Sequence, residues 1–455
     1  MSTKIFWQRA WNEPRRFCFW MALVSLLGIG AAVFVETQMP NFSPPRWVLI
    51  LCIFGLVGCV LGLVFGVLGL ALSWIPAIYR LEERILRRRF FALACVITFL
   101  ALLNAEENWR GKRAWENFKH EWEAKGERFD LASFIPPRVS DEKNFAMTPL
   151  LKPIFDYTQG TNGLHFNDTN GMNRLEQMSA ERNGEIRTNH LVVGRLERGS
   201  LTDLEKCRNF YLGNTNYPQP TKSGTAAEDI LFALGKFDQE MKELGDAALT
   251  RPYSRFPIQY DFEPSSGILL PHLAHIKGRC QLFQMRAIAR LDAGQAEGAL
   301  QDLKVGFRLS DSLRGEPFLI DYLVRLAMCS INLQTLREGL VRHAWNDSQL
   351  AELEKYLSTL DLFSEMKQTM RGERSLNISG IDFIRRLGPG DAMKYMDNEG
   401  GTQTKDMGID FIPGGWLYRN MLIIAQMHQP FTIGVADEKQ HRVFPEVTRA
   451  GDETL

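Results

Sequence analysis

Three apolar runs occupy the first quarter of the chain. They cover residues 17–35, 47–75 and 90–104, and none of them contains Asp, Glu, Lys, Arg or His. A helix needs about 20 apolar residues to cross a bilayer core, so the first run has the length of one span. The second run would be about 43 Å long as a helix, so it must tilt or extend into the interface. This pattern predicts a membrane domain at residues 1–104 with about three transmembrane helices.

The third run is short for a transmembrane helix. Phe90–Leu103 alone is ambiguous between a span and an interfacial segment. Arg87–Arg89 can extend their charged groups to one interface while Asn104 and Trp109 lie at the other, which lengthens the effective span. We therefore expect this run to cross the membrane as well.

Glycines repeat along the second run. Gly58, Gly62 and Gly66 recur every four residues and lie on nearly one helical face, where another backbone can approach closely. The first or third run can pack into this seam. The alternative is a homo-oligomer formed through the same three glycines.

Basic residues are unevenly distributed around the apolar runs. Four precede the first run, one lies in the loop 36–46, and five lie between Tyr79 and Arg89. Cytoplasmic loops retain Lys and Arg because clustered positive charge is difficult to translocate. The N-terminus and the arginine-rich loop are therefore expected in the cytoplasm, and everything after residue 104 outside it. A cleaved signal peptide is the competing interpretation of the first run, but that run is long for one and no small-residue cleavage site follows it.

The pattern changes after residue 104. Trp115, Phe118 and Trp122 recur at spacings of three and four, which predicts a helical stalk over residues 105–130. Residues 131–224 are rich in Pro, Gly, Asn and Thr without sustained periodicity, which predicts irregular structure. The other expected segments are a short strand at His190–Gly194, an α-helical domain at 225–430 and a C-terminal tail at 431–455.

Helical periodicity resumes at Thr225. Thr225 and Glu228 have the spacing of a capping box. Asp347 or Ser348 is expected to cap a later helix. The apolar face after the capping box consists of Ile230, Leu234, Phe237, Met241 and Leu244. The later expected helices cover residues 269–293, 296–313, 317–343 and 347–360, with shorter ones near 362–386 and 416–428.

The sequence AIARLDAGQAEGALQDLKVG, from Ala287 to Gly306, resembles one tetratricopeptide-type hairpin. Ala287, Gly294, Ala299 and Gly306 occupy positions where that repeat has small residues, because its two helices touch there. Neighbouring segments give no second copy at the offset of about 34 residues expected of an array. The resemblance implies a helical hairpin within an α-helical domain.

Six further stretches carry a resemblance that covers roughly residues 115–445. They read FIPPRVSDEKNFAMTPLL, RPYSRFPIQYD, LLPHLAHIKGRCQL, EPFLIDYLVRLAM, MRGERS and GGWLYRN. Their combination resembles a family of uncharacterised bacterial membrane-anchored proteins. The resemblance implies a membrane-anchored bacterial protein with a helical domain. Together with the apolar runs and the distribution of arginines, this predicts a multi-pass protein of the bacterial cytoplasmic (inner) membrane with an extracytoplasmic C-terminal domain. It implies no catalytic residue. Members of that family usually have one N-terminal span, whereas this sequence has three apolar runs.

Two patterns imitate catalytic or metal sites. Ser140 and Lys143 have the Ser-x-x-Lys spacing of penicillin-recognising enzymes, but they follow Pro136-Pro137 instead of opening a clear helix. His272 and His275 lie three residues apart on an expected helix, a spacing that can hold a metal ion. The sequence indicates no third ligand, so structural histidines are the preferred interpretation.

Two more patterns also have plain structural interpretations. Phe166–Gln177 imitates a calcium loop, but its first and last positions lack carboxylates, so we expect a turn-rich loop. Arg371 and Arg374 indicate a solvated or interhelical ion-pair cluster, with an anion site as the alternative. We therefore predict no catalytic residue, no cofactor and no metal.

Charge and cysteine usage narrow the classes of partner. Residues 1–104 carry ten basic and four acidic residues, and the remaining residues carry 43 and 49. An acidic domain repels phosphate backbones, so nucleic acid is not an expected partner. Cys207, Cys280 and Cys329 are the cysteines outside the apolar runs, and their number leaves one disulfide open without requiring it.

The sequence favours a membrane-anchored protein whose helical domain binds a protein or envelope partner. No catalytic signature is present, although carboxylate pairs distant in sequence would not show as a motif. An exported hydrolase with a dispersed site is therefore the first alternative. A subunit of a larger membrane complex is the second.

Overall fold

The computed structural model describes residues 83–160, 163–178, 193–389, 391–392 and 413–429, with isolated positions at 64, 436–437, 442–444 and 446. This part of the chain is mostly α-helical. The chain divides into two compact units, Met1–Arg110 and Gly111–Leu455. The first two apolar runs and the glycines at 58, 62 and 66 lie outside the described residues, as does most of the tail at 431–455.

The third apolar run belongs to a long helix, α4 (Glu83–Ala124). Large apolar side chains of its first half, from Phe91 to Leu103, are exposed around the whole circumference of the helix. Among the described residues, this is the one helix long and apolar enough to cross a membrane. The arginines from Arg84 to Arg89 lie within α4 and not in a loop. The stalk expected to reach residue 130 ends at Ala124.

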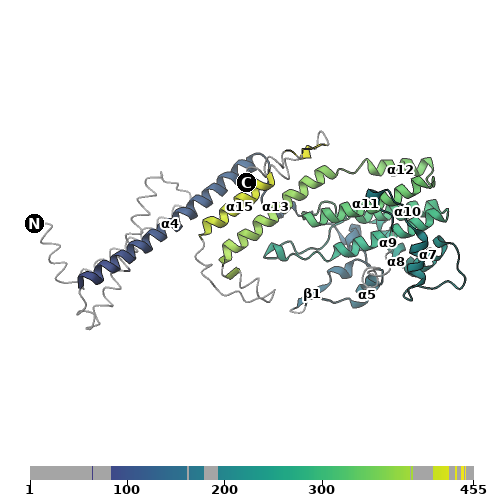
Figure 1. The fold of residues 1–455 in the computed structure, drawn as a ribbon, viewed down its shortest axis with the longest axis horizontal. Helices are drawn as coiled ribbons and strands as arrows, with labels where there is room; N and C mark the ends of the chain where they lie inside the picture. The colour runs from purple at the N-terminus through teal and green to yellow at the C-terminus, as the bar shows by residue number, and fades with distance from the viewer. Residues whose placement is uncertain are drawn as a thin grey trace, which may run out of the picture. The chain divides into compact units, whose positions relative to one another are not determined.

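A three-helix bundle forms from the second half of α4, α13 (Leu362–Leu387) and α15 (Gly414–His428). α13 and α15 lie side by side (Figure 1). Gly111 of α4 lies against Gly415 of α15, where a Cβ would collide with the opposite backbone, so glycine permits this close approach. The core of the bundle consists of Trp115, Phe129, Ile378, Met421 and Ala425.

Four helices make the centre of the helical domain. They are α9 (His272–Asp292), α10 (Ala296–Asp311), α11 (Leu319–Val341) and α12 (Asp347–Leu357). α9 and α10 form the expected hairpin, turning at Gly294, whose φ of 72° favours glycine. Ala287 and Ala299 are fully buried in the cluster between these helices. Gly306 lies against the side chain of Asn332, which a Cβ would displace.

The capping box at Thr225 is confirmed. The Thr225 side chain accepts from Glu228 N, and the Glu228 carboxylate accepts from Thr225 N. The helix it starts is interrupted: α7 (Ala226–Leu234) passes through η8 (Gly235–Phe237) into α8 (Asp238–Thr250). The expected cap at Asp347 or Ser348 is wrong, because Asn346 accepts from Gln349 N and forms a second capping box.

The segment 131–224 contains more regular structure than expected. β1 (Tyr157–Gly160) and β2 (Gly163–Phe166) form an antiparallel hairpin, followed by α5 (Thr169–Gln177) and α6 (Leu204–Leu212). These elements are too short to show a sustained period. Val193 and Gly194 are not in a strand, and the rest of the expected strand lies outside the described residues. The remaining short elements are η2 (Leu131–Phe134), η3 (Asp141–Lys143), η4 (Phe145–Met147), η5 (Lys152–Phe155), η7 (Leu196–Arg198), η9 (Ser265–Gly267), β3 (Ala436–Asp437) and β4 (Arg442–Val443).

Candidate functional site

A groove of about 630 Å³ lies between α8, α9, α10 and α12. Buried apolar side chains, Phe283, Phe307 and Leu353, form part of its lining. Leu249 of α8 stands at the same groove with 76 % of its surface exposed. Its large solvent-facing side chain leaves apolar area available to a ligand.

A buried carboxylate joins two arginines along one wall of the groove. Asp302 Oδ1 accepts from Arg286 Nη2 at 2.7 Å, and Asp302 Oδ2 accepts from Arg290 Nη1 at 2.8 Å. Arg286 also reaches Asp238 on α8 at 3.2 Å. Burial raises the pKa of Asp302, and the two arginines oppose that rise. These pairs fix α8, α9 and α10 around the groove.

Other charges of the groove are also paired within the protein. Lys304 of α10 lies 2.6 Å from Glu352 of α12, and Lys242 lies 2.6 Å from Asp246 on α8. The lining contains five basic and five acidic side chains, so its formal charge is zero. A strongly charged ligand would have to separate these pairs, which disfavours it.

Arg308 lines the groove close to Asp311. Its Nη2 donates to the carbonyl oxygens of Arg251 and Tyr253, and its guanidinium lies 4.7 Å from the centroid of the Phe145 ring. Burial lowers the pKa of Arg308, and the nearby Asp311 carboxylate opposes that effect. Arg308 thus connects α10 to the loop after α8.

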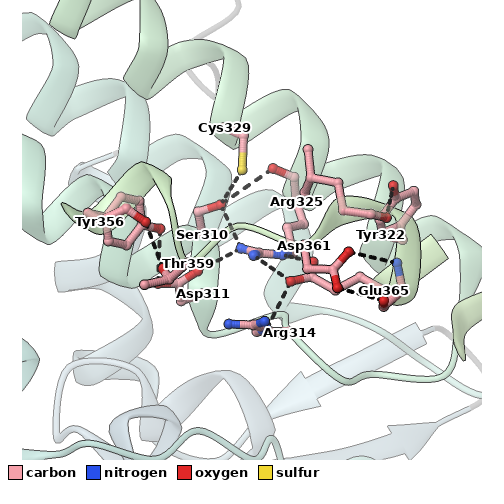
Figure 2. Close-up of polar contacts among 12 residues, drawn as sticks. Ser310, Asp311, Arg314, Tyr322, Arg325, Cys329, Tyr356, Thr359, Asp361 and Glu365 are labelled. Atoms are coloured by element: carbon pink, nitrogen blue, oxygen red, sulfur yellow. Dashed lines mark hydrogen bonds and ion pairs between the residues drawn. The ribbon is translucent and has the colours of Figure 1, made fainter. Parts of the chain in front are cut away.

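Asp311 links the groove to a polar network beneath it. Figure 2 shows Asp311 between Tyr356 and Arg325. The Tyr356 hydroxyl donates to Asp311 Oδ2 at 3.0 Å, and Arg325 Nη1 donates to Asp311 Oδ1 at 2.9 Å. Burial raises the pKa of Tyr356, and the Asp311 carboxylate raises it further. Tyr356 therefore remains a neutral hydrogen-bond donor at the groove.

Arg325 is the centre of this network. Its Nε and Nη2 donate to the two oxygens of Glu365 at 2.7 and 3.1 Å, and Glu365 also pairs with Arg314 at 2.8 Å (Figure 2). Burial lowers the pKa of Arg325, but the Glu365 hydrogen bond and the two carboxylates outweigh it and raise the pKa. The network ties α10, α11 and α13 together with the arginine charged.

The cysteines of the helical domain are buried free thiols. Cys329 Sγ lies 3.2 Å from Ser310 Oγ, and Cys280 Sγ donates to Asn332 Oδ1 at 3.4 Å. Burial raises the pKa of both thiols, so they are protonated and unreactive at neutral pH. The structure therefore contains no disulfide between Cys207, Cys280 and Cys329.

The two histidines are core residues. His272 is fully buried, and its ring stacks on Phe256 at 4.1 Å between centroids. His272 Nε2 lies 3.3 Å from Asp321 Oδ1, but the alignment does not form a hydrogen bond. Arg279 Nη1 donates to the carbonyl oxygen of His275. Among the described residues, no three His, Cys, Asp or Glu side chains are grouped to hold a metal ion.

The other imitations of active sites are structural or dispersed. Ser140 and Lys143 are exposed around η3, and Asp168 caps α5 by accepting from Gly171 N at 2.8 Å. A second Ser-x-x-Lys match begins at Ser364, whose hydroxyl donates to Asp361 at the start of α13. None of these residues lines the groove.

Arg371 and Arg374 form an ion-pair cluster, and because Arg374 is fully buried it is not the solvated form that the sequence left open. Arg371 and Arg374 both pair with Glu127, at 2.9 and 2.8 Å. Arg374 also donates to Gln429 Oε1, and its guanidinium lies 4.3 Å from the centroid of the Phe129 ring. Burial opposes ionisation of Glu127, but both arginines outweigh it and lower its pKa. The cluster connects α13 to the segments after α4 and α15.

The sequence did not identify the groove residues. Arg286, Arg290 and Asp302 lie within expected helices, and their positions on otherwise apolar faces were the available signal. The lining contains charged pairs, an apolar floor and a tyrosine, but no aligned nucleophile and base. This arrangement is suited to holding a ligand by shape and by neutral contacts. Comparison with known proteins adds no relative, since no protein-family model, no curated protein and no solved structure matches the chain.

Proposed function

We propose that this protein is a membrane-tethered, non-enzymatic module that binds a partner polypeptide in the groove between α8, α9, α10 and α12. The observation that carries the proposal is an apolar floor beside an exposed Leu249, surrounded by charges that are already paired. Recognition grooves commonly combine an apolar anchor site with a polar rim. The α9–α10 hairpin, interpreted as tetratricopeptide-like, supports the same function.

The occupant is a polypeptide segment with one large apolar side chain and a net charge near zero. The apolar side chain covers Leu249 and enters beside Phe283 and Phe307. The backbone of the segment offers carbonyl groups to the rim arginines without separating Asp302 from its partners. A highly charged segment lacks complementarity to a lining of zero formal charge.

The tether consists of the apolar part of α4, at residues 90–104, together with the spans proposed at 17–35 and 47–75. The distribution of arginines favours a multi-pass protein of the bacterial cytoplasmic membrane with the helical domain outside. Reporter fusions after Tyr79 and after Leu455 test this topology. Cytoplasmic reporter activity at Leu455 would refute export of the domain.

Peptide selection tests the binding function. The full chain in nanodiscs is used to select from a random twelve-residue peptide library, and selected peptides are measured by fluorescence anisotropy. We expect peptides with a central aromatic or large aliphatic residue and balanced charge. Leu249→Asp should weaken their binding at least tenfold, because it places a charge on the apolar contact.

A matched variant controls for surface changes. Phe232 on α7 is 51 % exposed and lies outside the groove, so Phe232→Asp should leave peptide affinity unchanged. A selection that yields no binding peptide, or peptides equally affected by both substitutions, would refute the groove as the binding site.

A further inference from the structure

One end of the three-helix bundle exposes large apolar side chains. Trp416 at the start of α15 is 50 % exposed, and Leu387 at the end of α13 is 42 % exposed. Both residues lie at the end of the bundle where Gly111 contacts Gly415. Arg385, two positions before Leu387, lies 4.9 Å from the ring centroid of Tyr418, two positions after Trp416, so the end of α13 and the start of α15 are neighbours there. Tryptophan at an exposed position is typical of interfaces with one apolar and one wet side.

The direction of the helices aims Trp416 toward this end. α15 runs parallel to the second half of α4, because Gly415 meets Gly111 while Gln429 and Glu127 share Arg374. Side chains of a helix lean toward its N-terminus. The indole of Trp416 therefore points away from the centre of the bundle, toward the end at which the bundle part of α4 begins with Gly111.

The length of chain between this end and the apolar run is short. Asn104 precedes Gly111 by seven positions, so the chain between them spans at most about 25 Å. The headgroup region adds about 5 to 8 Å to each side of the hydrocarbon core. A membrane held by residues 90–104 would thus lie within reach of a tryptophan beside Gly415.

Basic residues accompany Trp416 at this end. The three helical segments 111–116, 382–387 and 414–419 carry five basic and two acidic residues. Glu263 also pairs with Arg386, and when it is included the formal count at this end is five basic against three acidic residues. Anionic lipid headgroups complement such a surface.

We propose that the bundle end formed by Trp416, Leu387 and the neighbouring basic residues rests on the phospholipid surface, with the indole in the headgroup region. This inference rests on the membrane anchoring by residues 90–104 proposed above. The contact would restrict tilting of the helical domain relative to the bilayer, because residues 105–110 are otherwise its one connection to the proposed spans.

Photocrosslinking to lipid tests the proposal on the full chain. A benzophenone amino acid replaces Trp416 in nanodiscs of phosphatidylcholine and phosphatidylglycerol at three to one, and lipid adducts are quantified by mass spectrometry. Phe99 in the apolar run, 61 % exposed, is the positive position, and Phe232, 51 % exposed, is the matched negative position. We expect the adduct yield at position 416 to exceed that at position 232 at least fivefold.

Two further positions on the same helix face give a depth series. Ile423 and Met427 are exposed and lie about 10 and 16 Å beyond Trp416 along α15. Lipid adducts should decrease from 416 to 423 to 427, and removal of phosphatidylglycerol should lower the yield at 416 at least twofold. A uniform yield at these three positions, or no dependence on anionic lipid, would overturn the proposal.

The remaining outcomes separate the possible failures. Adducts at Phe99 without adducts at Trp416 would overturn the surface contact and leave the anchor intact. No lipid adduct at Phe99 would refute the anchoring by residues 90–104, and the surface contact with it. Crosslinks between two copies of the chain at Trp416, Ile423 and Met427 would identify the face as an oligomer interface and overturn the lipid proposal.

Discussion

Two buried polar sites in the helical domain, one around Arg325 and one around Asp321, differ in how far their charged groups are hydrogen-bonded. Around Arg325, the Asp311 and Glu365 carboxylates both receive hydrogen bonds from Arg325; Asp311 also accepts from the Tyr356 hydroxyl, and Glu365 forms an ion pair with Arg314. Around Asp321, the carboxyl has no hydrogen-bond donor on either oxygen, and His272 beside it has none on either ring nitrogen. In the first site each carboxylate has an arginine partner, whereas in the second neither group has a hydrogen-bond partner.

The pKa values express this difference. Burial raises the pKa of Asp321 to about 7 and lowers that of His272 to about 3, so the pair is neutral over the middle of the pH range. Glu373 raises the Asp321 pKa further. Burial also raises the pKa of Glu316, which accepts from Tyr260, to about 8. Without an arginine that donates to them, these two buried carboxyl groups keep their protons to near-neutral pH, and the Tyr260 hydroxyl alone does not prevent this at Glu316.

Removing Arg325 from the centre of its hydrogen-bonded network should produce the largest loss of stability. Arg325→Met leaves the Asp311 and Glu365 carboxylates without their main donor while both are largely buried. We expect a loss of about 3 to 5 kcal/mol in the free energy of unfolding, measured by urea titration of the full chain in detergent.

The matched control is Arg314→Met. Arg314 pairs with the same Glu365, but 45 % of its side chain is exposed. Its loss should cost less than about 1 kcal/mol. Equal effects of the two substitutions would contradict the central role of Arg325.

At the site of Asp321 and His272, the free energy of unfolding should depend on pH, because neither group has a hydrogen-bond partner to lose. The folded pKa of Asp321, about 7, lies above its ordinary value of 3.8, so the folded chain holds the proton more tightly. The stability associated with this proton is fully present below pH 3.8 and is lost as the pH rises through 7. Asp321→Asn keeps the shape and removes this titration. At pH 8 the variant should be more stable than the parent by about 2 to 4 kcal/mol.

Two groups near Asp321 set the controls for that experiment. Glu316→Gln should remove a similar loss between pH 4.5 and 8, because the Glu316 pKa is raised in the same direction. His272 acts with the opposite sign: its lowered pKa makes the stability decrease as the pH falls from 6.5 toward 3. Because the Asp321 and His272 shifts have opposite signs, their contributions to the pH slope largely cancel between about pH 4 and 6.5. An Asp321→Asn variant that is no more stable than the parent at pH 8 would refute the neutral pair.

The sequence predicted the helices better than these polar sites. The spacing of apolar residues predicted the α9–α10 hairpin and α11, and the capping box predicted the start of α7. Those signals are local, since periodicity and caps depend on residues within one or two turns. The cap at Asn346 was missed because Asp347 and Ser348 are equally suitable residue types at adjacent positions.

The groove and the buried sites depend on residues far apart in the chain. Arg286 and Asp302 meet across two helices, and Arg325 and Glu365 meet across 40 positions. No spacing rule within one helix relates such pairs. The Arg371 and Arg374 cluster was predicted in part: an ion-pair cluster was expected from their spacing, but its burial and its partner Glu127 were not identifiable.

Helix caps should show a smaller effect than the buried network, since their satisfied groups are partly exposed. Thr225→Ala removes the side-chain oxygen that accepts from Glu228 N at 3.2 Å. We expect a loss of about 1 kcal/mol in the free energy of unfolding. Thr225→Ser retains that oxygen and should behave as the parent. A loss in the serine variant as large as in the alanine variant would attribute the effect to the methyl group instead.

The exposed ion pair at the groove should show the smallest effect and completes the comparison. Lys304 and Glu352 are 2.6 Å apart, as close as any pair around Arg325, but 37 % and 47 % of their side chains are exposed. Solvent screens such a pair, so a double-mutant cycle with Lys304→Met and Glu352→Gln should give a coupling energy of about 0.2 to 1 kcal/mol. The coupling should fall further in 1 M salt, where the screening length is about 3 Å. A coupling energy as large as the Arg325 effect would show that distance outweighs burial in determining the strength of these pairs.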